Sequence, residues 1–395
     1  MKKIVEFPEE KKKKMNKKNI IMIVIAIVVV VVCITVTIVY QTNDQFRDFM
    51  DQYVFRKNVT EENVPMIEID YDSNTNVIPY GKYICILAEN TLFQYNASGK
   101  QEKEVKVEIS NPVYDVEGQY LVIGEKNNQK LYLISGDHIV WEKNVDGNLS
   151  KVTVNQNGYV SAIVTGTTYK SVIITYDNEG NELFKSYLSS VIAVDACISP
   201  DNQNLAYAEV STSGTVVQSS IKIISIEDVK EKETEPKYTY EAPQNSLLLR
   251  IKYQNKDQLI CMYDDKIDCI QNSEVKQLYS LNDENQKITF ADIELNNYVF
   301  RTVEQSTGLF SANTVVEMKN IGNEKENIYT LEEVAKNIVS NQNVIAVNLG
   351  TQVEFINTNG WLIKRYISTQ VIRNIVIADG VAGVIYRDKI ELISL

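Results

Sequence analysis

The stretch CISPDNQNLAYAEV (197–210) carries the pattern that decides the fold. A turn rich in Asp and Asn is followed by a short apolar run, as expected for a β-strand bounded by turn residues. The same turn-then-strand unit occurs eight times, and Gly, Asn or Asp lies at or close to the turn each time. The eight strands are YICILA (83–88), YLVIGE (120–125), YVSAIV (159–164), LAYAEV (205–210), LICMY (259–263), YVFRTV (298–303), VIAVNL (344–349) and VAGVIY (381–386).

The spacing of these strands predicts the architecture. Their first residues lie 37 to 54 residues apart, which is within or near the repeat length of β-propeller blades. A second turn recurs inside the unit, in YNASGK (95–100), YDNEGN (176–181) and INTNGW (356–361). Asn or Asp opens such a turn and Gly closes it. Each unit therefore predicts four antiparallel strands.

The strand count predicts how the ring closes. The eighth unit ends after its third strand, KIELISL (389–395), and MIEIDY (66–71) precedes the first unit. We expect MIEIDY to supply the missing outer strand, so that both ends of the chain meet in one sheet and leave no open edge. The fold class predicted is all-β, an eight-bladed β-propeller with this 3+1 closure; seven blades is the alternative.

The turn motifs also carry a resemblance. CISPDNQNLAYAE (197–209) is similar to the inner-strand element of WD-like blades. DNEGNELFKS (177–186) and NTNGWLIKRYIS (357–368) resemble the outer hairpin of quinoprotein-like blades. With its basic tail and single apolar segment, the chain resembles a family of uncharacterised single-pass proteins of bacterial cell envelopes. That resemblance implies a propeller and no known activity.

The N-terminus predicts a membrane anchor. The 21 residues 20–40 carry no charge and, as a helix, are long enough to cross a bilayer. Residues 1–18 hold eight lysines and three glutamates, so the N-terminus is expected in the cytoplasm and the rest outside the cell. A cleaved signal peptide is the competing interpretation. The domains predicted are a basic cytoplasmic tail (1–18), a transmembrane helix (19–40), a helical stalk or linker (41–63) and an extracytoplasmic propeller (64–395).

Charge and composition limit the partners and the chemistry. The total net charge is −12, and the part beyond residue 18 carries −17, which repels nucleic acids. The single histidine, His138, lies in the tight hairpin SGDHIVWE and is expected at the surface. We therefore predict no nucleic-acid partner, no catalytic residue, no metal site and no cofactor. Trp141 and Trp361 are expected on outer strands, packed between blades.

Two cysteines are candidates for a disulfide. LICMY-DDK-IDCIQ predicts a hairpin centred on Asp265, which would place Cys261 directly opposite Cys269. Opposed residues of an antiparallel pair lie close enough for a bridge. The alternative is two buried thiols.

A partner site is expected on the loops that join the second and third strands of each blade. These loops share one end of the propeller with the connections between blades, and we call that end the loop face. Three of the loops are long: 165–170, 211–220 and 304–313. Tyr169, Leu309 and Phe310 lie in them and are the candidate contacts for a protein or peptide; the alternative is that these side chains fold back onto their blades.

Two functions remain open from the sequence. The first is a membrane-anchored binding or scaffolding module for a protein, peptide or envelope component. The second is an envelope hydrolase or lyase that uses carboxylates in the central channel. A channel lined by charged side chains would favour chemistry, and an apolar or plugged channel would favour binding.

Overall fold

The computed structural model describes residues 17–43, 46, 50, 54–55, 57–60, 64–69, 75–230, 236–308 and 311–395. The chain forms two compact units, Met1–Asn58 and Val59–Leu395. In the first unit, helix α1 (Lys17–Thr42) covers the whole predicted span. It contains one segment, Met22–Thr42, that is long and apolar enough to cross a membrane.

The segment after α1 differs from the predicted helical stalk at its end. Residues 58–60 form strand β1 (Asn58–Thr60) rather than helix. Most of the residues between Thr42 and Asn58 lie outside the described part of the chain.

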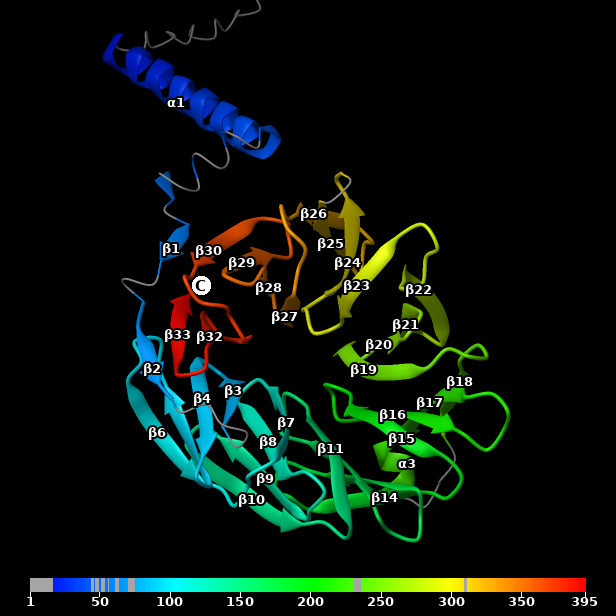
Figure 1. Ribbon diagram of the computed structural model, residues 1–395. Helices are drawn as coiled ribbons and strands as arrows, with labels where there is room; N and C mark the ends of the chain where they lie inside the picture. The colour runs from blue at the N-terminus through cyan, green and yellow to red at the C-terminus, as the bar shows by residue number, and fades with distance from the viewer. Residues whose placement is uncertain are drawn as a thin grey trace, which may run out of the picture. The chain divides into compact units, whose positions relative to one another are not determined.

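The second unit is a ring of eight antiparallel sheets, as Figure 1 shows. This confirms the eight-bladed propeller, and the alternative of seven blades is wrong. In each of the first seven blades, four consecutive strands run from the innermost to the outermost. The bounds are β3 (Asn76–Tyr80), β4 (Tyr83–Ala88), β5 (Thr91–Tyr95) and β6 (Gln101–Lys106) in blade 1; β7 (Pro112–Glu117), β8 (Tyr120–Glu125), β9 (Lys130–Ser135) and β10 (His138–Asn144) in blade 2; β11 (Asn148–Val154), β12 (Val160–Thr165), β13 (Ser171–Tyr176) and β14 (Glu182–Leu188) in blade 3; and β15 (Ile192–Ile198), β16 (Asn204–Ser211), β17 (Gln218–Ser225) and β18 (Tyr238–Glu241) in blade 4. Blade 4 also carries the short helix α3 (Ile226–Lys230) between its last two strands.

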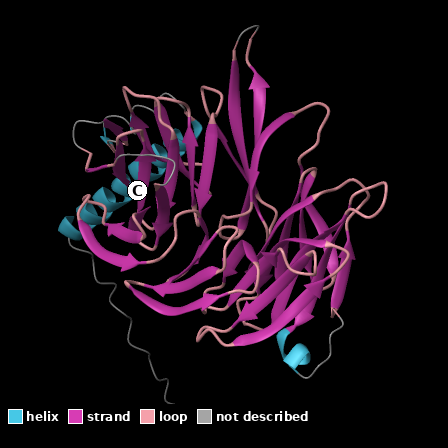
Figure 2. Cartoon of the chain, turned by 60° about the horizontal axis from the view of Figure 1, so that its bottom comes forward, coloured by secondary structure: helices cyan, strands magenta, loops and turns pink. Residues whose placement is uncertain are grey.

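The second half of the ring repeats the same order of strands. The longest strands, β24 and β25, form a hairpin that projects beyond the others (Figure 2). The bounds are β19 (Leu248–Asn255), β20 (Gln258–Tyr263), β21 (Lys266–Gln271) and β22 (Glu274–Ser280) in blade 5; β23 (Lys287–Asp292), β24 (Tyr298–Ser306), β25 (Ala312–Asn320) and β26 (Glu326–Thr330) in blade 6; and β27 (Asn337–Asn341), β28 (Val344–Asn348), β29 (Gln352–Asn357) and β30 (Leu362–Ile367) in blade 7.

Blade 8 joins the two ends of the second unit. Its three inner strands are β31 (Asn374–Ala378), β32 (Val381–Ile385) and β33 (Lys389–Ser394), and its fourth is β2 (Met66–Glu68). Ile67 of β2 lies opposite Ile390 of β33. The predicted 3+1 closure is therefore confirmed. Strand β1 adds a fifth strand to blade 7, beside β30.

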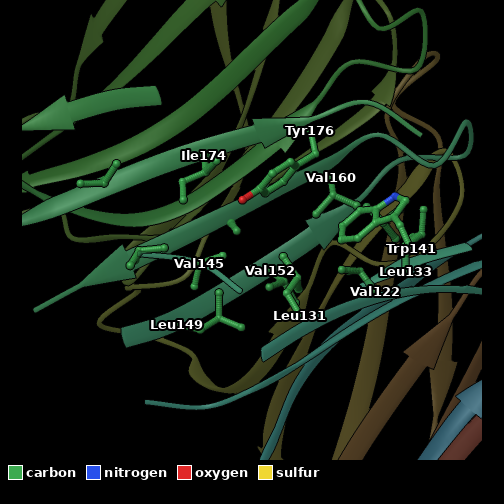
Figure 3. Packing of buried hydrophobic residues seen from close by; sticks show 14 residues of the cluster. Val122, Leu131, Leu133, Trp141, Val145, Leu149, Val152, Val160, Ile174 and Tyr176 are labelled. Atoms are coloured by element: carbon green, nitrogen blue, oxygen red, sulfur yellow. The ribbon is translucent and has the colours of Figure 1, made fainter. Parts of the chain in front are cut away.

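The core is divided among the contacts between blades. Eight clusters of buried apolar residues occur, and each draws its residues from two neighbouring blades. Figure 3 shows the cluster between blades 2 and 3, where Trp141 packs against Tyr176 with ring centroids 5.6 Å apart. Because each blade packs on both faces, its second strand carries apolar residues on both faces rather than on one. This is why YICILA and most of its counterparts are largely apolar runs.

Positive backbone φ explains the recurrent turn before each second strand. Seven of these eight turns contain a residue with φ between 52° and 82°; in the turn at Lys256 and Asp257 no such residue occurs. Gly and Asn adopt that conformation at the lowest cost. The seven residues are Gly81, Gly118, Gly158, Asn202, Asn297, Gln342 and Gly380.

The second recurrent turn has an additional role that its sequence did not suggest. A Cβ added at Gly99 would lie 2.9 Å from the carbonyl oxygen of Met66, and one at Gly360 would lie 2.8 Å from that of Ile328. At Gly180 the nearest atom would be in the Trp141 ring, at 2.8 Å. In all three cases the contact is with the outermost strand of the preceding blade. Glycine in this turn therefore allows neighbouring blades to approach closely.

This close approach predicts different costs for two glycine substitutions. Gly360 has φ +77° and Gly380 has φ +74°, but a Cβ at Gly380 would meet no atom within 4 Å. Both Gly380→Ala and Gly360→Ala are expected to cost about 1–2 kcal/mol of unfolding free energy through the positive φ. Gly360→Ala should cost about 1–3 kcal/mol more, because its Cβ overlaps backbone. Urea denaturation of the full-length protein in detergent measures both; equal losses would contradict the contact between blades.

The closure predicts the result of a short truncation. Leu392 and Ile393 are buried in the clusters on either side of blade 8, and the Leu392 N–H donates to the carbonyl oxygen of Pro65 at 2.8 Å. Deleting residues 392–395 is expected to open the ring and to expose strand edges that aggregate. Size-exclusion chromatography of the full chain in detergent tests this, with deletion of Leu395 alone as the control. A monodisperse protein after the longer deletion would argue against the closure as the feature that keeps the ring soluble.

Candidate functional site

The central channel of the propeller is lined by the innermost strands. Two hollows of about 270 and 440 Å³ lie along it. They are adjacent, because six residues line both: Tyr114, Asp115, Glu117, Lys252, Glu294 and Asn296.

One side of the channel is charged. Its residues come from blades 2 to 6, mostly as pairs two positions apart; two of these pairs lie within one strand, and in the third Glu294 follows the end of β23. Because side chains alternate along a strand, both members of such a pair point to the same face. The sequence contains these pairs as DVE, RIK and DIE, but only the ring identifies that face as the channel. The eight residues are Asp115, Glu117, Lys151, Asp195, Arg250, Lys252, Asp292 and Glu294.

Ion pairs join these charged residues across blades. Lys151 Nζ lies 2.7 Å from Asp195 Oδ1, which connects blades 3 and 4. Arg250 Nη1 lies 3.0 Å from Asp292 Oδ1, and Arg250 also pairs with Glu294, which connects blades 5 and 6. These pairs are interactions between inner strands, so they tie the blades together at the channel.

Lys252 is shared between two carboxylates. Its Nζ lies 2.6 Å from Glu294 Oε2 and 3.9 Å from Glu117 Oε2. Glu117 belongs to blade 2 and Lys252 to blade 5, so the longer contact crosses the channel.

The inner strands of blades 3 to 6 each contain a β-bulge, which interrupts the ladder to the second strand. In addition, three channel aspartates accept hydrogen bonds from backbone or hydroxyl groups of the next blade. The Val154 N–H donates to Asp115 Oδ2 at 2.8 Å, and the Ile251 N–H donates to Asp195 Oδ2 at 2.9 Å. The Ser340 hydroxyl donates to Asp292 Oδ2 at 2.8 Å. These carboxylates therefore have a structural role.

Two of the channel acids have altered titration. Burial raises the pKa of the Asp115 carboxyl, although the Val154 N–H and the charge of Lys252 act in the opposite direction. Burial also raises the pKa of Glu117, again opposed by Lys252. Both groups therefore hold a proton to a higher pH than an exposed carboxyl does.

The opposite side of the channel carries more aliphatic residues. It is formed by the inner strands of blades 1, 7 and 8, where Val77, Pro79, Val339, Ile375 and Ile377 line the larger hollow beside the polar residues Asn341, Asn374 and Asp379. The channel is thus neither uniformly charged nor apolar. The expectation that its polarity would separate chemistry from binding is not met, because both characters are present on opposite walls.

On the loop face, Tyr169 is exposed and has an aromatic neighbour. Its ring centroid lies 4.8 Å from that of Tyr187, which is also exposed. Leu309 and Phe310 lie outside the described residues. Tyr187 was missed by the sequence reasoning because it lies on an outer strand, β14, rather than in a long loop.

Further exposed apolar residues lie at the same end of the next two blades. They lie in the loop 211–218 of blade 4 and at the starts of β15 and β19. Hydrogen bonds connect these segments: the Ala193 N–H donates to Ser171 Oγ at 3.1 Å, and the Leu248 N–H donates to Ser219 Oγ at 3.1 Å. We call the set the loop-face patch; its members, each 37–54% exposed, are Tyr169, Tyr187, Ile192, Val216, Val217 and Leu249.

The predicted disulfide is corrected by the strand register. Cys261 pairs with Asp268, and Cys269 pairs with Ile260, so the hairpin is shifted by one residue from the expected alignment. A shift of one residue turns a side chain to the opposite face of the sheet. Cys261 therefore packs between blades 4 and 5, and Cys269 between blades 5 and 6. Both are free, buried thiols.

Three other expectations have mixed outcomes. His138 is exposed at the start of β10, as predicted at the surface, and its Nδ1 lies 3.6 Å from Asp137 Oδ1. Trp141 packs between blades, but Trp361 is 52% exposed and does not. Trp361 lies in the turn before β30 rather than on the outer strand itself.

Comparisons with known proteins identify a family. Residues 55–395 match the "Family of unknown function (DUF5711)", so the chain belongs to that family. Together with the eight blades, this confirms the expected resemblance to uncharacterised propeller proteins. No curated protein matches the sequence.

Several solved structures are similar to the chain. BamB from Moraxella catarrhalis is 13% identical, with 84% of this chain and 100% of that chain covered and a TM-score of 0.49. The hydrazine synthase of Kuenenia stuttgartiensis is 10% identical, with 83% and 97% covered and a TM-score of 0.42. The C-terminal WD40 domain of Sif2 is 10% identical, with 72% and 96% covered and a TM-score of 0.41.

Proposed function

We propose that the protein is a membrane-anchored, extracytoplasmic binding module that contacts a protein partner through the loop-face patch. The observation that carries this proposal is that exposed Tyr, Val, Ile and Leu side chains lie at the same end of blades 3 to 5. Contiguous exposed apolar side chains are typical of interaction sites.

The composition of the surrounding loops supports a protein as the occupant. Segments 165–171 (TGTTYKS) and 211–218 (STSGTVVQ) contain one charged residue between them, Lys170, in a unit that is strongly acidic overall. Depletion of charge and enrichment of tyrosine are features of the cores of protein interfaces. An anionic polymer or a lipid headgroup would instead be recognised by clustered cations. The partner surface is therefore expected to be apolar and nearly uncharged.

The anchor and its orientation belong to the same proposal. Met22–Thr42 is long and apolar enough to span a bilayer, and the lysines of residues 1–18 favour the cytoplasmic side for the N-terminus. The propeller would then lie outside the cell, next to the membrane and the envelope. An extracytoplasmic protein or peptide is the partner that this location provides.

Photo-crosslinking in intact cells tests the patch. p-Benzoylphenylalanine in place of Tyr169 is expected to give a discrete adduct with one protein. The same residue in place of Trp361, an exposed aromatic on the rim, should give none. Val217→Asp should reduce the Tyr169-site adduct at least fivefold, because a charge is introduced into an apolar contact. Val275→Asp is the matched control, since Val217 and Val275 are 41% and 53% exposed.

Two results would count against this proposal. Equal adducts from both positions, or a Val217→Asp effect no larger than that of Val275→Asp, would remove the patch as the contact. External protease added to spheroplasts before illumination should abolish the adduct if the propeller is extracytoplasmic. Survival of the adduct would contradict the orientation.

A second function, an envelope hydrolase or lyase, is favoured by the raised pKa of Asp115 and Glu117 in the channel. Acids with raised pKa in a cleft are candidates for general acid catalysis. The full-length protein in detergent, incubated with envelope saccharides and peptides, should then show turnover that Glu117→Gln reduces at least about 100-fold. Glu142→Gln, on the outer strand β10, is the control. No turnover of any of these compounds by the wild type would count against this function.

A further inference from the structure

The larger of the two hollows, which we call the channel mouth, has two walls of opposite character. It measures about 440 Å³, within the usual range for sites that hold small molecules. Asp115, Glu117 and Glu294 lie on the polar side, and Val77, Pro79 and Val339 lie on the aliphatic side. No part of the loop-face patch lines it.

Negative charge exceeds positive charge in the channel mouth. Four carboxylates line it, those of Asp115, Glu117, Glu294 and Asp379, and Lys252 is the single cationic residue among its described lining. Lys252 lies closer to Glu294, at 2.6 Å, than to Glu117, at 3.9 Å. A cationic group near Glu117 and Asp115 would therefore be attracted, whereas an anionic group would be repelled.

The contacts between blades cover the aliphatic wall only in part. Val77 packs against the cluster between blades 8 and 1, and Val339 against the cluster between blades 7 and 8, yet both remain partly exposed, as does Pro79, and all three line the hollow. Apolar surface of this kind, facing water in a hollow, is stabilised by contact with the apolar part of a ligand. Asn341 at the same level is already engaged, since its Nδ2 donates to the carbonyl oxygen of Ile377 at 2.7 Å.

We propose that the channel mouth binds a small amphiphilic cation, in which an ammonium or guanidinium group faces Glu117 and Asp115 and an apolar body lies against Val77, Pro79 and Val339. The charge excludes anionic molecules, and the aliphatic wall favours a cation with an apolar chain over a bare one. This site is independent of the loop-face patch, so either proposal can fail without the other.

Three small probes separate the contributions of charge and apolar contact. The full-length protein in detergent is titrated with n-butylammonium, n-butyrate and methylammonium, and binding is followed by saturation-transfer NMR. Saturable binding of n-butylammonium is expected, at least tenfold tighter than that of methylammonium, and no saturable binding of n-butyrate. Equal binding of n-butyrate and n-butylammonium, or no saturable binding of n-butylammonium, would overturn the proposal.

Variants of the two walls locate the site. Glu117→Gln is expected to weaken n-butylammonium binding at least fivefold, whereas Glu142→Gln, on the outer strand of blade 2, should leave it unchanged. Val339→Asn should weaken n-butylammonium and leave methylammonium unaffected. Elution volume and circular dichroism report whether each variant is folded. Equal effects of Glu117→Gln and Glu142→Gln in folded protein would show that the cation binds elsewhere.

Discussion

The structure depends on the pairing of β2, near the start of the propeller, with β33, at its end, in a single sheet. Three residues of β2 complete blade 8, and Ile67 packs there beside residues of blade 1. Every blade buries apolar residues on both faces, so a ring that failed to close would expose two such faces at once. It would also expose unpaired strand edges, which favour aggregation. Closure therefore satisfies the hydrophobic effect and the hydrogen bonding of the backbone together.

The same ring has two kinds of contact between blades. Between the middle strands the contacts are apolar, as in the cluster around Trp141 and Tyr176. At the channel, carboxylates and cations of blades 2 to 6 make polar contacts instead, beside inner strands that are bulged in blades 3 to 6. Blades 7, 8 and 1 add aliphatic side chains there, beside Asn341, Asn374 and Asp379. The ring is thus regular in its fold and asymmetric in its chemistry, and the asymmetry produces a channel with two different walls.

The sequence predicted correctly those features that depend on a few neighbouring residues. Turns that need a positive φ and apolar runs of strand length are visible in the sequence. The blades could therefore be counted, and the strand that closes the ring could be identified. The disulfide predicted between Cys261 and Cys269 was wrong. The register of their hairpin depends on one residue in the turn, which the sequence pattern alone does not resolve. Tyr187 was missed because it lies on the outer strand β14, and only the folded blade brings its ring to Tyr169 in the loop.

The sequence by itself determined the number of blades, the strand that closes the ring and the apolar helix at the N-terminus, because turn chemistry, strand period and hydropathy act over a few residues. Only the tertiary structure decided which side chains face the channel and which residues share the loop-face patch. Asp115 and Lys252 are 137 positions apart in the chain, yet they line the same hollow. Their proximity follows from the way eight blades close around an axis, a property of the whole ring that no single repeat contains.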